Sequence, residues 1–376
     1  MSAQREIVVG VDSEGYRERR NITGLPTKNV RYRRVRGARA PLAFAHYVTY
    51  RRPHFALQHH FQDFGLSRAD LHHFFFSISF GPKPWIVSFS SWIPRWGKQD
   101  RRGLERLADD GCRRLIPISQ HAWDVQRHVL QHNADLLPAI EPKVEVIHPA
   151  QRPIIADFGE KPGAHDTIDF VFVGKQFFLK GGAAMLRVFT RLLDEGLPLR
   201  LHVVSSMQHL DFTTRSTPTD VAAARDLMGR YAGRIVFHGR LPNADVLELL
   251  RRSHVALLPT IADTYGYFAL EAQAAGCPVI TTPVQALAEI NNDSCGWLLD
   301  VPLNEIGRAR RRTEEERAAF DAALEEGLDA AVRDVLARPD QIAIRGRRAL
   351  ARIRDEHDPE RTAIRLRAIY DEALAT

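Results

Sequence analysis

Short apolar runs alternate with longer segments whose apolar residues recur at helical spacing. The short runs are typical of buried strands, and the longer segments are typical of amphipathic helices. The short runs predict strands over Glu6–Val11, Val30–Val35, Leu71–Phe80, Trp85–Phe89, Arg114–Ser119, Val144–His148, Ile168–Val173, Leu201–Val204, Ile235–His238, His254–Leu258 and Val279–Thr282. The longer segments predict helices over Leu42–Tyr50, Gln99–Asp110, Gln120–Gln131, Ala183–Glu195, Asp220–Tyr231, Asn243–Arg252, Gly266–Ala275, Arg308–Glu326, Leu328–Ala337 and Glu360–Ala375. Because strands alternate with helices, we expect an α/β fold with parallel, doubly wound sheets.

A segment rich in proline and glycine interrupts this alternation near residue 150. Residues 149–164 read PAQRPIIADFGEKPGA and show no periodicity, as is typical of a connection between domains. We therefore expect two Rossmann-like domains, residues 1–150 and 165–358, joined by a linker over 151–164. A closing amphipathic helix occupies residues 359–376 in this prediction.

The composition is ordinary for a globular protein, with 44% hydrophobic and 26% charged residues. The three cysteines form neither a disulfide framework nor a zinc ribbon. No apolar run is long enough to span a bilayer, and the N-terminus lacks the apolar core of a signal peptide. We therefore expect a cytoplasmic protein. Histidines at 54, 59, 60, 72 and 73 match no ligand spacing, so no metal is expected there.

Positive charge is concentrated in the first half of the chain. Residues 1–150 hold 23 Lys and Arg against 14 Asp and Glu, whereas the whole chain holds 52 against 46. Such an excess fits an anionic partner, which includes a phosphorylated acceptor, the inner surface of a membrane, or nucleic acid. A solvated basic face gives the same count. Nucleic acid is the least favoured partner, because no nucleic-acid-binding motif is present.

The most informative stretch is Asp263–Pro278, which reads DTYGYFALEAQAAGCP and follows a predicted strand. Gly266 has no Cβ and lets the backbone approach a ligand closely. A helix that begins there presents its N-terminal N–H groups, from Tyr265 to Phe268, to an anion such as phosphate. Asp263 and Glu271 flank this point, where two carboxylates suit the sugar hydroxyls on either side of a diphosphate. A helix N-cap and a solvated helix residue are the alternative interpretation of the two acids.

A second stretch, Phe170–Gly182, reads FVFVGKQFFLKGG. A predicted strand runs into Gly174, and Lys175 and Lys180 follow before the next helix. Two lysines beside a glycine-rich helix start can neutralise a diphosphate. The segment is not a Walker A loop, because the lysine precedes the glycine pair and no Ser or Thr follows to hold magnesium. A turn with solvated lysines is the alternative.

Together these two stretches resemble the family-4 glycosyltransferases. The first is similar to the family's E-x7-E region, including the Ala-Gly-Cys-Pro-Val-Ile that follows it, and the second is similar to its Gly-Arg…Lys-Gly pair. Members of this family are retaining, nucleotide-sugar-dependent enzymes of the GT-B fold. The resemblance therefore implies two Rossmann-like domains facing each other across a cleft, with the acceptor domain first, the donor domain second, and the last helix crossing back to the first domain. It is specific over residues 165–300 and loose over 1–150.

The resemblance implies a role for each matched residue. Lys175 and Lys180 stabilise the leaving diphosphate, Asp263 faces the hexose and Glu271 binds the ribose, while Glu289 matches a further acid of the family. The implied donor-binding residues are Gly174, Tyr265, Gly266, Tyr267, Phe268, Glu271 and Glu289. Lys175 stands where arginine is usual, which removes a bidentate phosphate contact. Asp263 stands where glutamate is usual, which shortens the reach to the sugar by one methylene.

On the acceptor side the resemblance identifies two candidates. The family often carries a histidine at the end of the strand that corresponds to Trp85–Phe89, and Ser90 occupies about that position. His73, in another family-like segment, is the second candidate for approaching the cleft. A lone histidine in an apolar strand is more often structural.

The implied function is transfer of a hexose from a nucleoside-diphosphate sugar to an acceptor hydroxyl, with retention of configuration. No metal or other cofactor is expected, since the chain has no D-x-D triplet. The departures at Lys175 and Ser90 leave a second hypothesis, a non-catalytic nucleotide-sugar-binding subunit of the same fold. The acceptor, the donor's base and sugar, and the oligomeric state do not follow from the sequence.

Overall fold

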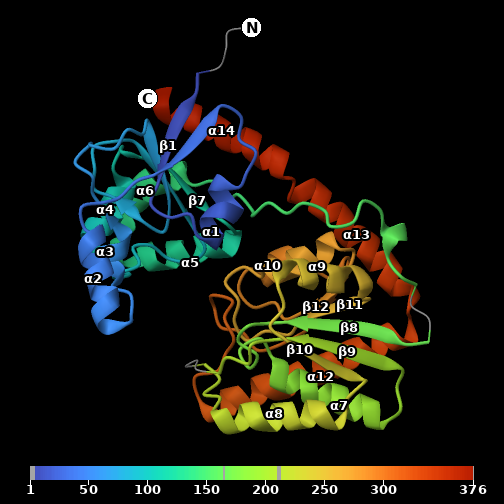
Figure 1. Ribbon diagram of the computed structural model, residues 1–376. Coiled ribbons are helices and arrows are strands. Elements are labelled where there is room, and N and C mark those ends of the chain that lie inside the picture. Colours follow the sequence, from blue (N-terminus) through green and yellow to red (C-terminus); the bar gives the residue numbers. More distant parts are fainter. Residues whose placement is uncertain (1–4, 164–165, 210–212, 376) are drawn as a thin grey trace. The chain divides into compact units, whose positions relative to one another are not determined.

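The computed structural model describes residues 5–163, 166–209 and 213–375, and it divides into two compact units (Figure 1). The first unit comprises Met1–Ala150 together with His357–Thr376, and the second comprises Gln151–Glu356. Ala164 and His165, where the predicted linker ends and the predicted second domain begins, lie outside the described residues, as do the terminal residues 1–4 and 376.

The first unit contains a parallel sheet of five strands, which lie in the order β2 (Val30–Arg34), β1 (Ile7–Val11), β4 (Leu71–Phe75), β6 (Trp85–Phe89) and β7 (Cys112–Pro117). Strand β1 pairs with β2 through Ile7 and Val30, and with β4 through Val9 and Leu71. Every residue of β4 and β6 is buried, as expected for central strands of a parallel sheet. A separate parallel pair joins β3 (His60–Phe61) and β5 (Ile78–Ser79).

Most helices of the first unit connect these strands. Asp100 and Ser119 cap two of them, because their side-chain oxygens accept hydrogen bonds from N–H groups in the first turn. The helices are α1 (Tyr16–Glu18), a π-helical turn (Arg19–Thr23), α2 (Ala40–Tyr50), α3 (Phe55–His59), α4 (Arg101–Ala108), α5 (Gln120–Leu130), α6 (Leu137–Ile140), two short 3-10 turns (Gln131–Leu136 and Glu141–Lys143), and α14 (Pro359–Ala375).

Helix α14, at the end of the chain, completes the core of the first unit (Figure 1). Its buried Leu366, Ile369 and Tyr370 belong to one hydrophobic cluster with residues of β1, β4, β6 and β7. The Tyr370 hydroxyl lies 2.8 Å from His73 Nδ1 and 3.4 Å from the Tyr32 hydroxyl. The apolar face and these polar contacts fix α14 on the sheet.

The second unit contains a parallel sheet of six strands, which lie in the order β10 (Ile235–Gly239), β9 (Leu199–Val204), β8 (Ile168–Val173), β11 (Val255–Leu258), β12 (Val279–Thr281) and β13 (Gly296–Leu298). The order shows how the chain is wound. After β8, the chain places β9 and β10 on one side of that strand and then β11, β12 and β13 on the other side.

Helices cover both faces of this sheet (Figure 1). One face carries α7 (Gly182–Asp194), α8 (Pro218–Arg230) and α12 (Glu314–Ala337), and the other carries α9 (Asn243–Arg252) and α10 (Tyr267–Ala274). Ion pairs join α7 to α12, among them Arg191 with Asp329 at 2.9 Å. The remaining elements are a 3-10 turn (Phe158–Glu160), α11 (Leu287–Ile290) and α13 (Asp340–Glu356).

Several predicted elements differ from the structure. The predicted strand Leu71–Phe80 is broken, because Phe76 adopts a φ of 74° and turns the chain between β4 and β5. The predicted strand Val144–His148 is reduced to a single bridge between Val144 and Leu115.

The predicted pair of helices after Arg308 is one helix, α12, which begins after its cap residue Thr313 and runs without a break. Gly327 does not interrupt it, because the glycine lies against Leu299 inside the packed unit. Helix α13 was not predicted, since its many arginines obscure a narrow apolar face formed by Ile342, Leu350 and Ile353.

Replacing Tyr370 with Phe should destabilise the first unit by about 1–2 kcal/mol, because His73 Nδ1 would lose its partner inside the core. Urea unfolding followed by tryptophan fluorescence reports on this unit, since four of the five tryptophans lie in it. Tyr50→Phe is the matched control, because Tyr50 is 60% exposed. Equal unfolding midpoints for the two variants would contradict the role given to this hydroxyl.

Candidate functional site

The sheet of the second unit changes its winding direction between β8 and β11, which are neighbours. Loops that follow such a pair of strands leave the sheet in opposite directions, and a crevice forms at the carboxyl ends of the strands. Ligands of doubly wound proteins bind at this switch point. Here the loop after β8 carries Gly174, Lys175 and Lys180, and the loop after β11 carries Asp263 and Gly266.

Two glycines allow the loop after β8 to fold tightly against its neighbours. Gly181 has a φ of 80°, and a Cβ placed on it would lie 1.9 Å from the carbonyl oxygen of Pro259. A Cβ on Gly174 would lie 2.9 Å from Lys180 Cγ. The glycines therefore bring the start of α7 against the end of β11 and let the Lys180 side chain pass over Gly174.

Lys180 and Asp263 form an ion pair across the switch point. Lys180 Nζ lies 2.7 Å from Asp263 Oδ2 and donates a second hydrogen bond, of 2.9 Å, to the carbonyl oxygen of Ala262. Both side chains are about one-fifth exposed, so solvent screens the pair less than it screens a surface pair. An ammonium has three N–H donors, and these contacts use two of them.

The second oxygen of Asp263 organises the loop before α10. Asp263 Oδ1 accepts hydrogen bonds from the N–H groups of Gly266, at 2.9 Å, and Tyr265, at 3.3 Å. The Asp263 N–H donates in turn to Gln285 Oε1 at 2.9 Å. Two of the four N–H groups predicted to face a phosphate are therefore bonded to Asp263 in this structure. Gly266, with a φ of 92°, is the N-cap of α10.

The other predicted donor-side residues lie on the same edge of the sheet or on the adjoining helices. Lys175 directly follows Gly174 and is exposed, while its carbonyl oxygen accepts hydrogen bonds from Gln208 N–H and Ser206 Oγ. Glu271 is a half-buried residue of α10, and Glu289 is a half-buried residue of α11, which follows β12. Tyr265 is buried, and its ring centroid lies 5.3 Å from that of Tyr267, which is half-buried like Phe268.

The sheet of the first unit has a switch point of the same kind between β1 and β4. Asp12 follows β1 directly, and Ser77 lies just beyond β4. The Ser77 hydroxyl donates a 2.5 Å hydrogen bond to Asp12 Oδ2 and lies 3.2 Å from His59 Nδ1. Asp12 Oδ1 is buried and has no hydrogen-bond partner among the described residues. This carboxylate therefore keeps an unused acceptor at a ligand-binding position of the fold.

Burial and charge shift the pKa values of this group. The pKa of Asp12 is raised to about 7, mainly by burial and also by the charge of Glu18, while hydrogen bonds from Ser77 and from the backbone of Asp12 and Ser13 oppose the rise. The pKa of His59 is lowered to about 4, mainly by burial and also by the charges of Arg95 and Arg17. At neutral pH the histidine is therefore uncharged, and Asp12 titrates.

Asp12 and His59 line a pocket of about 840 Å³ in the first unit. Its wall also includes Arg34, Arg36 and Arg39, together with residues at the start of α2. The volume is in the range that small-molecule sites occupy in proteins. Carboxylate and guanidinium groups on one wall can bind hydroxyls and anions respectively.

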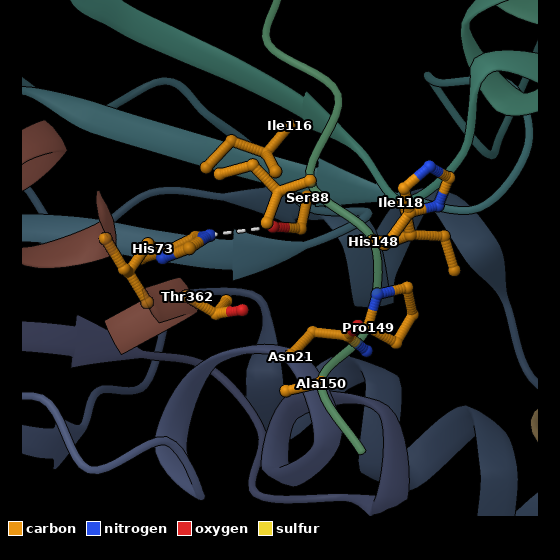
Figure 2. Close-up of a pocket in the computed structure, with 11 residues that line it drawn as sticks. Asn21, His73, Ser88, Ile116, Ile118, His148, Pro149, Ala150 and Thr362 are labelled. Atoms are coloured by element: carbon orange, nitrogen blue, oxygen red, sulfur yellow. Dashed lines mark hydrogen bonds between the residues drawn. The ribbon is translucent and has the colours of Figure 1, made fainter. Parts of the chain in front are cut away.

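The two predicted acceptor-side residues lie elsewhere in the first unit. His73 is fully buried in β4, where its Nε2 lies 2.8 Å from Ser88 Oγ (Figure 2). Its Nδ1 contacts the Tyr370 hydroxyl. Burial lowers the pKa of His73 to about 3. The cavity beside it, lined also by Asn21 and Thr362, measures about 10 Å³, which is room for about one water molecule. Ser90 is buried just beyond β6, at the same sheet edge as Asp12.

Part of the second unit matches a known protein family. Residues 167–308 match the family described as "Glycosyl transferases group 1". Glycogen synthase from Mycobacterium tuberculosis H37Rv is 32% identical over 136 residues, covering 36% of this chain and 28% of that protein. D-inositol 3-phosphate glycosyltransferase from Thermobifida fusca is 29% identical over 135 residues, covering 36% of this chain and 31% of that protein. The match thus spans less than a third of each of these two relatives.

Solved structures define the fold of the whole chain. A glycosyltransferase from Rickettsia africae has a TM-score of 0.64 at 13% identity, covering 99% of both chains. HepE from Anabaena, solved in complex with UDP, has a TM-score of 0.58 at 13% identity, covering 97% of this chain and 91% of that one. The protein has the GT-B fold of glycosyltransferases, with two Rossmann-like domains. The α/β GT-B prediction is confirmed.

The sequence interpretation overlooked Asp12, Ser77 and Gln285. An acidic residue directly after the first apolar strand was a usable signal for Asp12, because that is the ligand-binding edge of a parallel sheet. Ser77 and Gln285 act through contacts between distant segments, so no local pattern marked them. Among the described residues, no helix is long and apolar enough to cross a membrane. In the same part of the chain, no group of three or more His, Cys, Asp or Glu side chains could hold a metal ion.

Replacing Gly266 with Ala should destabilise the second unit by about 1–3 kcal/mol. The residue has a φ of 92°, and a Cβ would lie 2.4 Å from Leu287 Cδ2, so the variant combines backbone strain with overpacking. Gly229→Ala is the control, because Gly229 is exposed in α8 and a Cβ there meets no atom within 4 Å. We expect a lower melting temperature for Gly266→Ala and an unchanged or higher one for Gly229→Ala.

Asp12 should make the first unit less stable as pH rises from about 4 to about 7. Its pKa is higher in the folded than in the unfolded state, so the folded state holds the extra proton across this window and loses that advantage as the pH passes about 7. Asp12→Asn should remove this loss of unfolding free energy, which is on the order of 1–4 kcal/mol. Urea unfolding at several pH values measures it as the difference between variant and wild type, which cancels the opposite contribution of His59. A difference that does not grow with pH would refute the assignment.

Proposed function

We propose that this protein is a glycosyltransferase that moves a hexose from a nucleoside-diphosphate sugar to an acceptor hydroxyl, with retention of configuration and without a metal ion. The observation that carries the proposal is the Lys180 ammonium, held by Asp263 at the β8–β11 switch point within the segment that matches the glycosyltransferase family. Two of its N–H donors are used by the protein, and the third suits a phosphate oxygen.

In this proposal the second unit holds the donor. The bond between the anomeric carbon and the β-phosphate oxygen breaks, a bond from that carbon to the acceptor oxygen forms, and the proton of the acceptor hydroxyl passes to the departing diphosphate oxygen. Lys180 and Lys175 stabilise the negative charge that collects on the departing diphosphate. Glu271 binds the ribose, and Glu289 contributes a further carboxylate to the donor site.

Asp263 has a double role in this proposal. Its carboxylate already accepts from Lys180, Gly266 and Tyr265, and a carboxylate offers about four acceptor positions. One position is left for a hydroxyl of the hexose. The same side chain thus orients the cation and contacts the sugar, so the two are held at a fixed spacing.

We assign the acceptor to the 840 Å³ pocket of the first unit, where Asp12 Oδ1 is a buried acceptor without a partner among the described residues. A polyhydroxylated acceptor supplies the hydroxyl that this oxygen lacks. Ser90, at the same sheet edge, stays a second candidate. His73 is the weaker one, because both of its ring nitrogens are already hydrogen-bonded inside the core.

Lys180→Ala and Glu271→Ala should each lower donor use about a hundredfold, since Lys180 stabilises the departing diphosphate and Glu271 binds the ribose of the donor in this proposal. A thermal-shift screen of nucleoside-diphosphate sugars first identifies the donor, because a ligand that binds only the folded state raises the melting temperature. Donor hydrolysis and transfer are then measured with that donor.

Glu248→Ala is the control, because this residue of α9 is exposed. Near-normal turnover in both site variants would remove the assignment. A wild-type chain that binds a donor but neither hydrolyses nor transfers it would instead support the non-catalytic subunit. The anomeric configuration of the product tests retention, and activity in the presence of a chelator tests metal independence.

A further inference from the structure

Exposed apolar side chains are concentrated at one place in the first unit. Among the described residues, six of the twelve exposed large hydrophobic residues lie between positions 42 and 55. Five of them belong to α2, which has no buried residue. The six are Leu42, Phe44, Tyr47, Val48, Tyr50 and Phe55. We call these six, with the exposed Arg51 and Arg52 that follow α2, the α2 surface.

The α2 surface has a defined geometry. Phe44, Tyr47 and Val48 are spaced three and four residues apart, so they share one side of the helix. Phe44 is 70% exposed. On the other side of the helix, the His46 ring lies 4.7 Å from that of Tyr50 and 5.0 Å from that of His54. Contiguous apolar exposure of this kind marks an interaction site in soluble proteins.

The segment of the chain that contains this surface carries charges of a single sign. Residues 19–62 contain ten Lys and Arg and no Asp or Glu, although the whole chain has a net charge of only +6. Arg36, Arg51 and Arg52 are exposed. No acidic side chain within this segment competes for these guanidinium groups, so they are available to an anionic partner.

We propose that the α2 surface docks on an anionic lipid bilayer. Its aromatic and aliphatic side chains enter the headgroup region, and the surrounding arginines bind lipid phosphates. Apolar side chains on one side of a helix, flanked by basic residues, are features that favour binding at a membrane interface, and Phe44, Tyr47 and Val48 form such a side here. Two other partners fit this surface less well. A nucleic acid would leave the apolar side chains of Leu42, Phe44 and Val48 without a partner. A second copy of the chain would bring two positively charged segments together, and these repel each other.

Vesicle flotation tests this proposal without reference to catalysis. The wild-type protein should float with vesicles of phosphatidylcholine mixed with phosphatidylglycerol, but not with phosphatidylcholine alone, and added salt should weaken the binding. Phe44→Ser with Val48→Ser should lower the bound fraction about tenfold. Arg51→Glu with Arg52→Glu should lower it by a similar factor. The four positions are exposed, so circular dichroism should show unchanged folding.

Two control variants match these changes elsewhere on the chain. Ile364→Ser replaces an apolar residue of α14 that is 72% exposed, and Arg230→Glu with Arg252→Glu reverses two exposed charges of the second unit. Both should bind vesicles like the wild type.

Three outcomes would overturn the proposal. The first is flotation that Phe44→Ser with Val48→Ser leaves intact. The second is binding of RNA or DNA without flotation. The third is a dimer, seen by sedimentation velocity, that the same apolar variant dissolves while no vesicle binding is found. Donor binding by the second unit can succeed or fail independently of each result.

Discussion

The Lys180–Asp263 ion pair depends on the winding of the sheet to which it is attached. Lys180 follows β8 and Asp263 follows β11, which lie side by side although about 85 residues separate them in the chain. The pair can form because the chain leaves β8 toward β9 and returns at β11, so that both loops emerge at one edge. Gly174 and Gly181 remove the side chains that would hold those loops apart. The ion pair is thus a product of topology and of two missing Cβ atoms.

The first unit has the same kind of switch point as the second, but different side chains lie there. Its switch point lies between β1 and β4, and there a hydroxyl, rather than an ammonium, bridges to the carboxylate, from Ser77 to Asp12. The second unit therefore offers a cation at its switch point, whereas the first offers a carboxyl group whose pKa lies near 7. A ligand rich in negative charge suits the former, and a neutral hydroxyl suits the latter. The arginines of the pocket wall extend this preference to ligands that also carry an anion.

Much of this was readable in the sequence, and the exceptions have physical causes. Most strands of both sheets were visible as apolar runs because central strands of a parallel sheet are buried on both faces. The edge strand β13 was not predicted. Lys180 and Asp263 were found because they flank glycines at strand ends. Phe76 was missed as a break, since a positive φ in a bulky residue is imposed by the surrounding packing and leaves no mark in composition. Asp12, Ser77 and Gln285 could not be connected, because their hydrogen bonds span from 22 to 65 residues of chain.

The return of α14 to the first unit has a consequence for biosynthesis. Helix α14 completes a core whose strands are made first, so a ribosome must finish the whole second unit before the first can close. Chains stalled just short of α14 would then carry a protease-resistant second unit beside an incomplete first one, and a first unit resistant at that stage would disprove this order. Grafting α14 ahead of β1 would join the two pieces of the first unit in one continuous stretch. In such a permuted chain, the first unit could fold before the second unit is translated.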